Sequence, residues 1–168
     1  MQQQQVHLCA LMKSSPLINM TLLQSIQQLK DSNDYEGMIQ LIPYAKSMGI
    51  ETSLVGDKIV STLPFMESNI GNPTLPALHG GLVAGFMENA ALFHLLWCFE
   101  LKKTPKVIDF SIDYLRPGLT ETTYSHCDVI RLGRRVALCN IKAWQADSEK
   151  PIAIARGHFL LSANEPIG

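Results

Sequence analysis

The sequence predicts an α+β domain in which an antiparallel sheet wraps around one long central helix, with a helical extension at the N-terminus. Residues 80–98 are almost entirely apolar or small, and they are long enough for a helix of about five turns. Two segments of strand-like composition precede this helix and four follow it. Short connections join the later strands, which favours antiparallel pairing because parallel strands need long crossovers.

Length and composition fit one soluble globular domain. The chain has 168 residues, of which 46% are hydrophobic and 17% charged, and its formal net charge is −1. These values argue against a disordered chain and against a strongly basic nucleic-acid binder. The four cysteines are widely spaced without a CxxC motif, so neither a zinc site nor a disulfide framework is predicted. We expect a cytoplasmic protein that needs no metal or cofactor and binds no nucleic acid.

The N-terminal part of the chain carries helical spacing. Apolar residues recur every three or four positions in residues 20–30, which predicts a first helix. Residues 34–49 predict a second short helix, in which Pro43 starts or kinks a turn and Gly49 ends it. We therefore expect residues 1–48 to form a tail and a helical lead-in.

Residues 49–164 are expected to form the main domain. It begins with two strands in residues 50–65, joined by a tight turn at Gly56 and Asp57. Residues 66–81 are rich in Asn, Gly and Pro, which disfavours regular structure and predicts a loop. After the helix, strands are predicted in residues 106–115, 122–132, 134–146 and 151–163.

The central helix is apolar nearly all round, and its length would also suit a membrane span. Glu88, Asn89 and His94 lie in its middle, where lipid makes polar groups costly. We therefore expect no membrane insertion and a sheet that curls around the helix. Edge strands of such a sheet tend to pair with another copy, so a homodimer or tetramer is expected.

Glu88 is the one carboxylate in this apolar helix. At about 100° per residue it shares a stripe with small and apolar residues, namely Gly81, Ala84, Gly85, Ala91, Leu92 and Leu95. Burial disfavours the charged form of a carboxylate, and no cationic residue lies one turn away to offset this. Such a group is either hydrogen-bonded for structural reasons or poised as a base or nucleophile beside a cavity. The residue type alone leaves both interpretations open.

The segment His79-Gly80-Gly81 comes at the predicted start of the helix. Free N–H groups there form a site for developing negative charge, and glycines let a ligand approach the backbone. The other interpretation is a tight loop-to-helix connection in which His79 packs or caps. Glu88 lies roughly 13 Å of helix rise from His79, so a second subunit would have to bring the two kinds of group together.

Four segments carry a family resemblance: LHGGLVAGFMENAA, VIDFSIDYLRPG, RLGRRVALCNIKAW and PIAIARGHFLL. In this order they resemble the hotdog-fold acyl-CoA thioesterases of the PaaI type, over roughly residues 40 to 163. The resemblance implies a long helix wrapped by an antiparallel sheet. It also implies dimers that join two sheets into one, with active sites between the subunits.

The resemblance further implies residue roles. Gly80 would offer its backbone N–H to the thioester carbonyl, with His79 beside it. Glu88 of the other subunit would act as general base on a water, or attack directly as nucleophile. Asn72 or Asn69 would correspond to a loop asparagine that helps to orient the substrate. Substrate binding would also involve Gly81, Arg116, Arg134 and Arg135.

The arginines lie near predicted strand ends, where they could meet the phosphates of coenzyme A or simply be solvated surface charges. The sequence also departs from the family. Related enzymes often hold the attacking water with a Ser or Thr at positions that are Leu92 and Val107 here, and Asn89 or Thr104 would have to substitute. Besides an acyl-CoA hydrolase, a non-catalytic acyl-CoA or acyl-carrier binding protein and a purely structural dimer therefore remain open.

Overall fold

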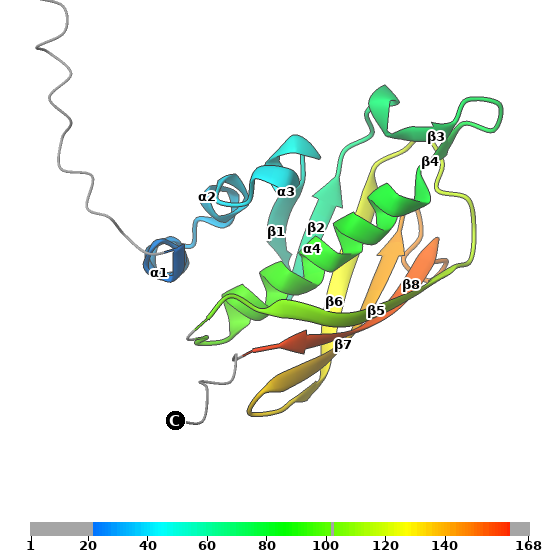
Figure 1. Ribbon diagram of the computed structural model, residues 1–168. Helices are drawn as coiled ribbons and strands as arrows, with labels where there is room; N and C mark the ends of the chain where they lie inside the picture. Colours follow the sequence, from blue (N-terminus) through cyan, green and yellow to red (C-terminus); the bar gives the residue numbers. More distant parts are fainter. Residues whose placement is uncertain (1–21, 102, 162–168) are drawn as a thin grey trace, which may run out of the picture.

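The computed structural model describes residues 22–101 and 103–161. Its helices are α1 (Leu22–Asp31), α2 (Tyr35–Gln40), α3 (Pro43–Ser47) and α4 (Gly80–Cys98). Its main strands are β1 (Glu51–Val55), β2 (Lys58–Leu63), β5 (Lys106–Tyr114), β6 (Thr123–Leu132), β7 (Val136–Trp144) and β8 (Ala153–Leu160). Figure 1 shows α4 lying across one face of the curved sheet, with α1 to α3 beside it near β1.

The main sheet has the strand order β1-β2-β6-β7-β8-β5, and every neighbouring pair is antiparallel. This confirms the two strands predicted before the long helix and the four predicted after it. The first hairpin turns at Gly56, whose positive φ of 64° suits glycine in a tight turn. The order leaves β1 and β5 as the two edge strands.

Two parts of the sequence prediction need correction. Residues 66–81 are not irregular throughout, because a short 3-10 turn (Glu67–Asn69) leads into β3 (Ile70–Asn72), which pairs with β4 (Ala77–Leu78). The predicted second helix is two helices, because α2 ends before Pro43, which occupies the first turn of α3. The first predicted helix is confirmed from Leu22 onward, and its residues 20 and 21 lie outside the described part.

The hydrophobic core has two parts, one on each side of α4. One cluster joins α4 to β6, β7 and β8 through residues such as Met87, Cys139 and Phe159. The other joins α4 to the N-terminal helices and β2 through residues such as Met38 and Phe86. Packing on both sides explains why the helix is apolar nearly all round.

The length and composition of α4 would suit a membrane span, but half of its most apolar stretch is buried within the fold. It is therefore the core helix of a two-layer domain. The boundary that the sequence predicts at residues 48 and 49 stays a prediction.

Candidate active site

The start of α4 is fixed by its capping residue. The His79 side chain accepts a hydrogen bond at Nδ1 from the Gly81 N–H at 3.0 Å, so the ring is an N-cap. The His79 backbone N–H donates to the Asn69 carbonyl at 3.0 Å, and the His79 carbonyl accepts from the N–H groups of Leu82 and Val83. The loop before the helix and the first helical turn are thereby tied together.

Gly80 has the one backbone donor of this turn that is left free. Its N–H makes no hydrogen bond to any residue in the described ranges 22–101 and 103–161. Its carbonyl accepts a hydrogen bond from the Tyr114 hydroxyl at 2.7 Å. A Cβ at Gly80 would lie 3.3 Å from that tyrosine ring, so the two residues are closely packed. An unpaired N–H at the positive end of a helix can bind developing negative charge.

A pocket of about 340 Å³ opens beside Gly80. Apolar side chains form most of its lining, including Leu78, Val83, Leu115, Pro117 and Ile152. The sequence-predicted Arg116 also lines this pocket, and its guanidinium donates to the Pro151 carbonyl at 2.7 Å. The pocket can therefore hold an apolar part of a ligand beside Gly80, with the Arg116 guanidinium at its side.

Glu88 is half-buried, and its carboxylate has no hydrogen-bond or ion-pair partner among the described residues. The residues that the sequence analysis places on one helical stripe with Glu88 differ in burial. Ala91 and Leu95 are fully buried against the sheet, whereas Gly81, Ala84 and Gly85 stay partly or fully exposed beside Glu88. The carboxylate thus lies at the border of the helix face that the sheet covers, and it is open to an approaching molecule.

One chain does not bring Glu88 and Gly80 together. The two residues are eight positions apart on α4, which is about 12 Å of helix rise. An oxygen bound at the Gly80 N–H would therefore be out of reach of the carboxylate on the same helix.

The two loop asparagines differ in their surroundings. Asn72 is exposed, and its Oδ1 accepts a hydrogen bond from the Thr74 N–H at 3.0 Å, which is a local turn contact. Asn69 places its Nδ2 in a buried position without a partner in the described residues. The backbone carbonyl of Asn69 accepts a hydrogen bond from the His79 N–H, so the residue lies next to the start of α4.

Arg134 and Arg135 lie in the connection between β6 and β7, far from Gly80 in the same chain. With Arg131, Arg156 and His158 they line a basic hollow of about 510 Å³. The Arg135 carbonyl accepts from the Leu161 N–H, which places it level with Lys106 at the start of β5. Gly80 lies at the Tyr114 end of that strand, about 26 Å away along its length.

The four residues that the sequence analysis considered for holding an attacking water differ in their surroundings. Leu92 and Val107 pack against the sheet-facing core cluster. Asn89 is buried and donates its Nδ2 to the Gly85 carbonyl at 2.8 Å, and Thr104 is exposed.

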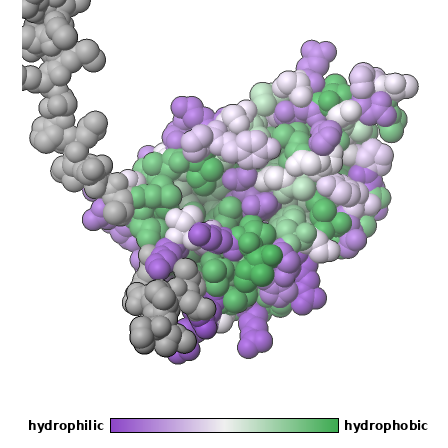
Figure 2. Space-filling view, in the orientation of Figure 1, coloured by the Kyte–Doolittle hydropathy of each residue, from purple (hydrophilic) through white to green (hydrophobic). Residues whose placement is uncertain are grey.

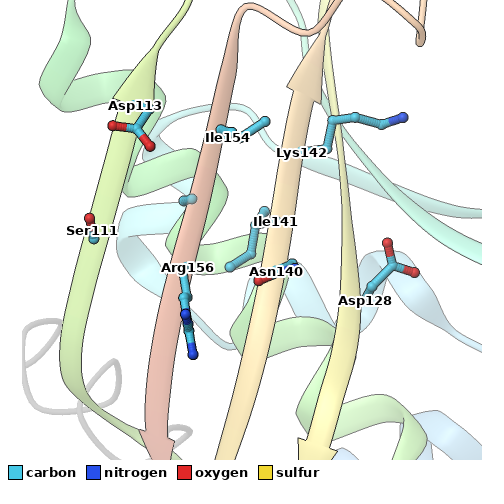
Figure 3. A pocket seen from close by; sticks show the side chains of 9 residues that line it. Ser111, Asp113, Asp128, Asn140, Ile141, Lys142, Ile154 and Arg156 are labelled. Atoms are coloured by element: carbon cyan, nitrogen blue, oxygen red, sulfur yellow. The ribbon is translucent and has the colours of Figure 1, made fainter.

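A further hollow of about 420 Å³ lies on the outer face of the sheet (Figure 3). Ser111, Arg156, Asn140 and Asp128 form one row across β5, β8, β7 and β6 there. It contains none of the sequence-predicted site residues. Within the described residues, no group of three His, Cys, Asp or Glu side chains is placed to hold a metal ion.

Sequence reasoning missed Tyr114. Its ring lines the pocket and its hydroxyl donates to the Gly80 carbonyl. In the sequence it is only one residue of a predicted strand, with no sign of a role in the site. A signal existed in the "DYLRPG" segment, where an aromatic residue ends a strand before a turn, but no pattern linked it to a residue 34 positions earlier.

Comparisons with known proteins bear on the family and the fold. Residues 71–160 match the acyl-CoA thioesterase N-terminal domain family. A protein of known structure from Chromobacterium violaceum is 43% identical, over 84% of this chain and 99% of that chain, with a TM-score of 0.70. A thioesterase from Haemophilus influenzae is 26% identical, over 75% of this chain and 88% of that chain, with a TM-score of 0.65.

The fold also matches the PaaI protein of the E. coli phenylacetic acid degradation operon, at 20% identity over 85% of this chain and 97% of that chain, with a TM-score of 0.65. None of the curated proteins compared with the chain matches it. From the family match and the helix wrapped by an antiparallel sheet, we conclude that the chain belongs to the acyl-CoA thioesterase family of hotdog-fold proteins.

Proposed function

We propose that this protein hydrolyses an acyl-CoA thioester to a free acid and coenzyme A, at sites shared between two subunits. The observation that carries the proposal is the free Gly80 N–H at the start of α4. A thioester carbonyl under attack becomes an oxyanion, and a fixed backbone donor at a helix N-terminus stabilises that charge. The chain's membership of a thioesterase family supports the same chemistry.

Glu88 would supply the base or the nucleophile. As a base, its carboxylate takes a proton from a water whose oxygen attacks the thioester carbon, and the C–S bond then breaks to release the coenzyme A thiolate. As a nucleophile, the carboxylate forms a mixed anhydride, expels the thiolate, and is freed when water attacks the anhydride. The unpaired, half-buried carboxylate supports either role, because no internal partner has to be given up first.

The edge strand β5 suggests how two chains complete the site. β5 pairs with β8 on one side only, and Ile108 on this strand is 54% exposed. Figure 2 shows hydrophobic residues gathered on the face of the molecule that carries α4 and β5. Antiparallel pairing of β5 with its copy would bury this edge and form one continuous sheet.

Such pairing would also gather the arginines at one site. In an antiparallel pair, the Tyr114 end of one β5 meets the Lys106 end of the other strand. Arg134 and Arg135 of the second copy would then approach Gly80 and Arg116 of the first. Guanidinium groups bind phosphate in a bidentate manner, so these side chains suit the phosphates of coenzyme A.

Of the two loop asparagines, Asn69 fits a substrate-orienting role better than Asn72. Its buried Nδ2 has a free donor beside His79, whereas Asn72 already holds the Thr74 backbone. A buried amide without a partner is costly, and a substrate oxygen would satisfy it.

A non-catalytic acyl-CoA or acyl-carrier binding protein is the second candidate. It is favoured by the apolar character of Leu92 and Val107, which pack against the core at positions where the family resemblance often implies a water-holding Ser or Thr. Such a protein would bind acyl-CoA saturably and release no product.

The test is chromatographic detection of the free acid from short, medium, long and aromatic acyl-CoA substrates. We expect turnover with the wild type and a loss of roughly 10²- to 10⁴-fold in kcat for Glu88→Ala. Full turnover in that variant would contradict the mechanism. Thermal stabilisation by acyl-CoA without any product from the wild type would establish the binding protein instead.

A further inference from the structure

Tyr114 makes an unusual contact for a residue at the end of an edge strand. Its side chain is 53% exposed, yet its hydroxyl donates to the Gly80 carbonyl at 2.7 Å. Hydroxyl donors at this distance form a well-made hydrogen bond. The contact joins the last residue of β5 to the first residue of α4.

The peptide unit between Gly80 and Gly81 is consequently held at both of its polar ends. Its oxygen accepts from Tyr114, and its N–H donates to the Nδ1 of His79 at 3.0 Å. A planar peptide with both ends bonded has little freedom to rotate. The free Gly80 N–H belongs to the preceding peptide, whose oxygen, the His79 carbonyl, accepts from Leu82 and Val83, so the peptides on both sides of the Gly80 Cα are held.

A glycine at position 80 would otherwise leave the backbone of this turn with more conformational freedom than another residue would. A Cβ there would lie 3.3 Å from the Tyr114 ring, so a side chain at this position would make the ring shift by a few tenths of an ångström. Tyr114 and Gly80 line the same pocket, which places both residues at its wall.

We propose that Tyr114 is a positioning residue that orients the Gly80 N–H toward the thioester carbonyl oxygen in this pocket. The proposal rests on the proposed thioesterase function. Tyr114 does not have to touch the reacting atoms, since it acts through the Gly80–Gly81 peptide. Donor alignment matters most when the oxyanion forms, so Tyr114 would affect the chemical step more than substrate binding.

The test is Tyr114→Phe, which removes only the hydroxyl. We expect kcat to fall roughly tenfold or more and KM to stay within about twofold, because the donor remains but is less well oriented. The matched control is Tyr35→Phe, since Tyr35 stacks on Trp97 near the other end of α4, with ring centroids 4.1 Å apart. Equal kcat for Tyr114→Phe and wild type would overturn the proposal.

A second measurement decides the proposal even if the protein hydrolyses no thioester. Amide NMR would follow the Gly80 and Gly81 N–H groups during titration with an acyl-CoA ketone analogue, in which a methylene group replaces the sulfur. We expect the Gly80 resonance to shift in the wild type and to shift much less in Tyr114→Phe, with faster exchange of the Gly81 amide. Identical shifts and exchange rates in both proteins would overturn the positioning role. Absent turnover in the wild type would contradict only the proposed hydrolysis.

Discussion

The Nδ1 atom of His79 accepts a hydrogen bond from the Gly81 N–H at 3.0 Å, so this histidine caps α4. The first turn of α4, which carries the proposed oxyanion donor, is therefore capped by one side chain.

Replacing His79 with Ala removes the cap acceptor. We expect the free energy of unfolding to fall by about 1 kcal/mol, measured by denaturant titration, because the Gly81 N–H loses its partner. His79→Asn keeps a side-chain acceptor at the N-cap and serves as the control. If both variants lost the same free energy of unfolding, the hydrogen bond to the Gly81 N–H would not be the cause of the destabilisation.

Gly80→Pro deletes the proposed oxyanion donor with little change in backbone shape. Proline is favoured at the first position of a helix, and His79 already has the extended backbone that precedes proline, with a ψ of 127°. We expect kcat to fall roughly 10²- to 10³-fold relative to Gly80→Ala, which adds a Cβ beside Tyr114 but keeps the N–H. Equal kcat values for the two variants would mean that this N–H does not bind the oxyanion.

His94 should make stability depend on pH. Burial lowers the pKa of His94 below its ordinary value of 6.5, the nearby His126 lowers it further, and Asp128 partly opposes this shift. The folded protein then binds fewer protons than the unfolded chain, so stability decreases as the pH falls through about 6.5.

Unfolding titrations at about pH 8 and about pH 5.5 check this effect. We expect His94→Gln to lose less stability than the wild type between the two pH values, because it carries no titrating imidazole. The same loss in both proteins would assign the pH dependence to other groups.

The exposed edge of β5 should control oligomerisation. A lysine at Ile108 would place a charge where we propose that two β5 strands pair, so we expect Ile108→Lys to form more monomer in sedimentation experiments. Leu54→Lys is the matched control, since Leu54 is 53% exposed on β1, the opposite edge strand. If the Leu54 variant dissociated and the Ile108 variant did not, the pairing edge would be β1.

Much of the fold could be predicted because its signals are local. The alternation along residues 106–115 and the apolar run of α4 each report on a single element, and the short connections indicated antiparallel neighbours. The pair β3 and β4 was missed because strands of two or three residues carry no readable period. Helices α2 and α3 were predicted as one helix, because the sequence left open whether Pro43 starts a new turn or kinks the helix.

The site was predictable only in part, because its contacts join distant parts of the chain. The sequence indicated Gly80 and Glu88 by residue type and resemblance, but it could not show that the Gly80 carbonyl binds Tyr114. It also left the choice between Asn69 and Asn72 open, since only the folded loop shows which amide is buried.

In the proposed dimer each site takes Gly80 from one subunit and Glu88 from the other, and mixing variant subunits distinguishes such a shared site from a site within one chain. Co-expression of Gly80→Pro chains with Glu88→Ala chains gives mixed dimers that each contain one site with both residues intact. We predict that the two parent variants are nearly inactive and that a random mixture recovers about a quarter of wild-type turnover. If mixed dimers, confirmed by differential tags, stayed as inactive as their parents, the shared site would be contradicted.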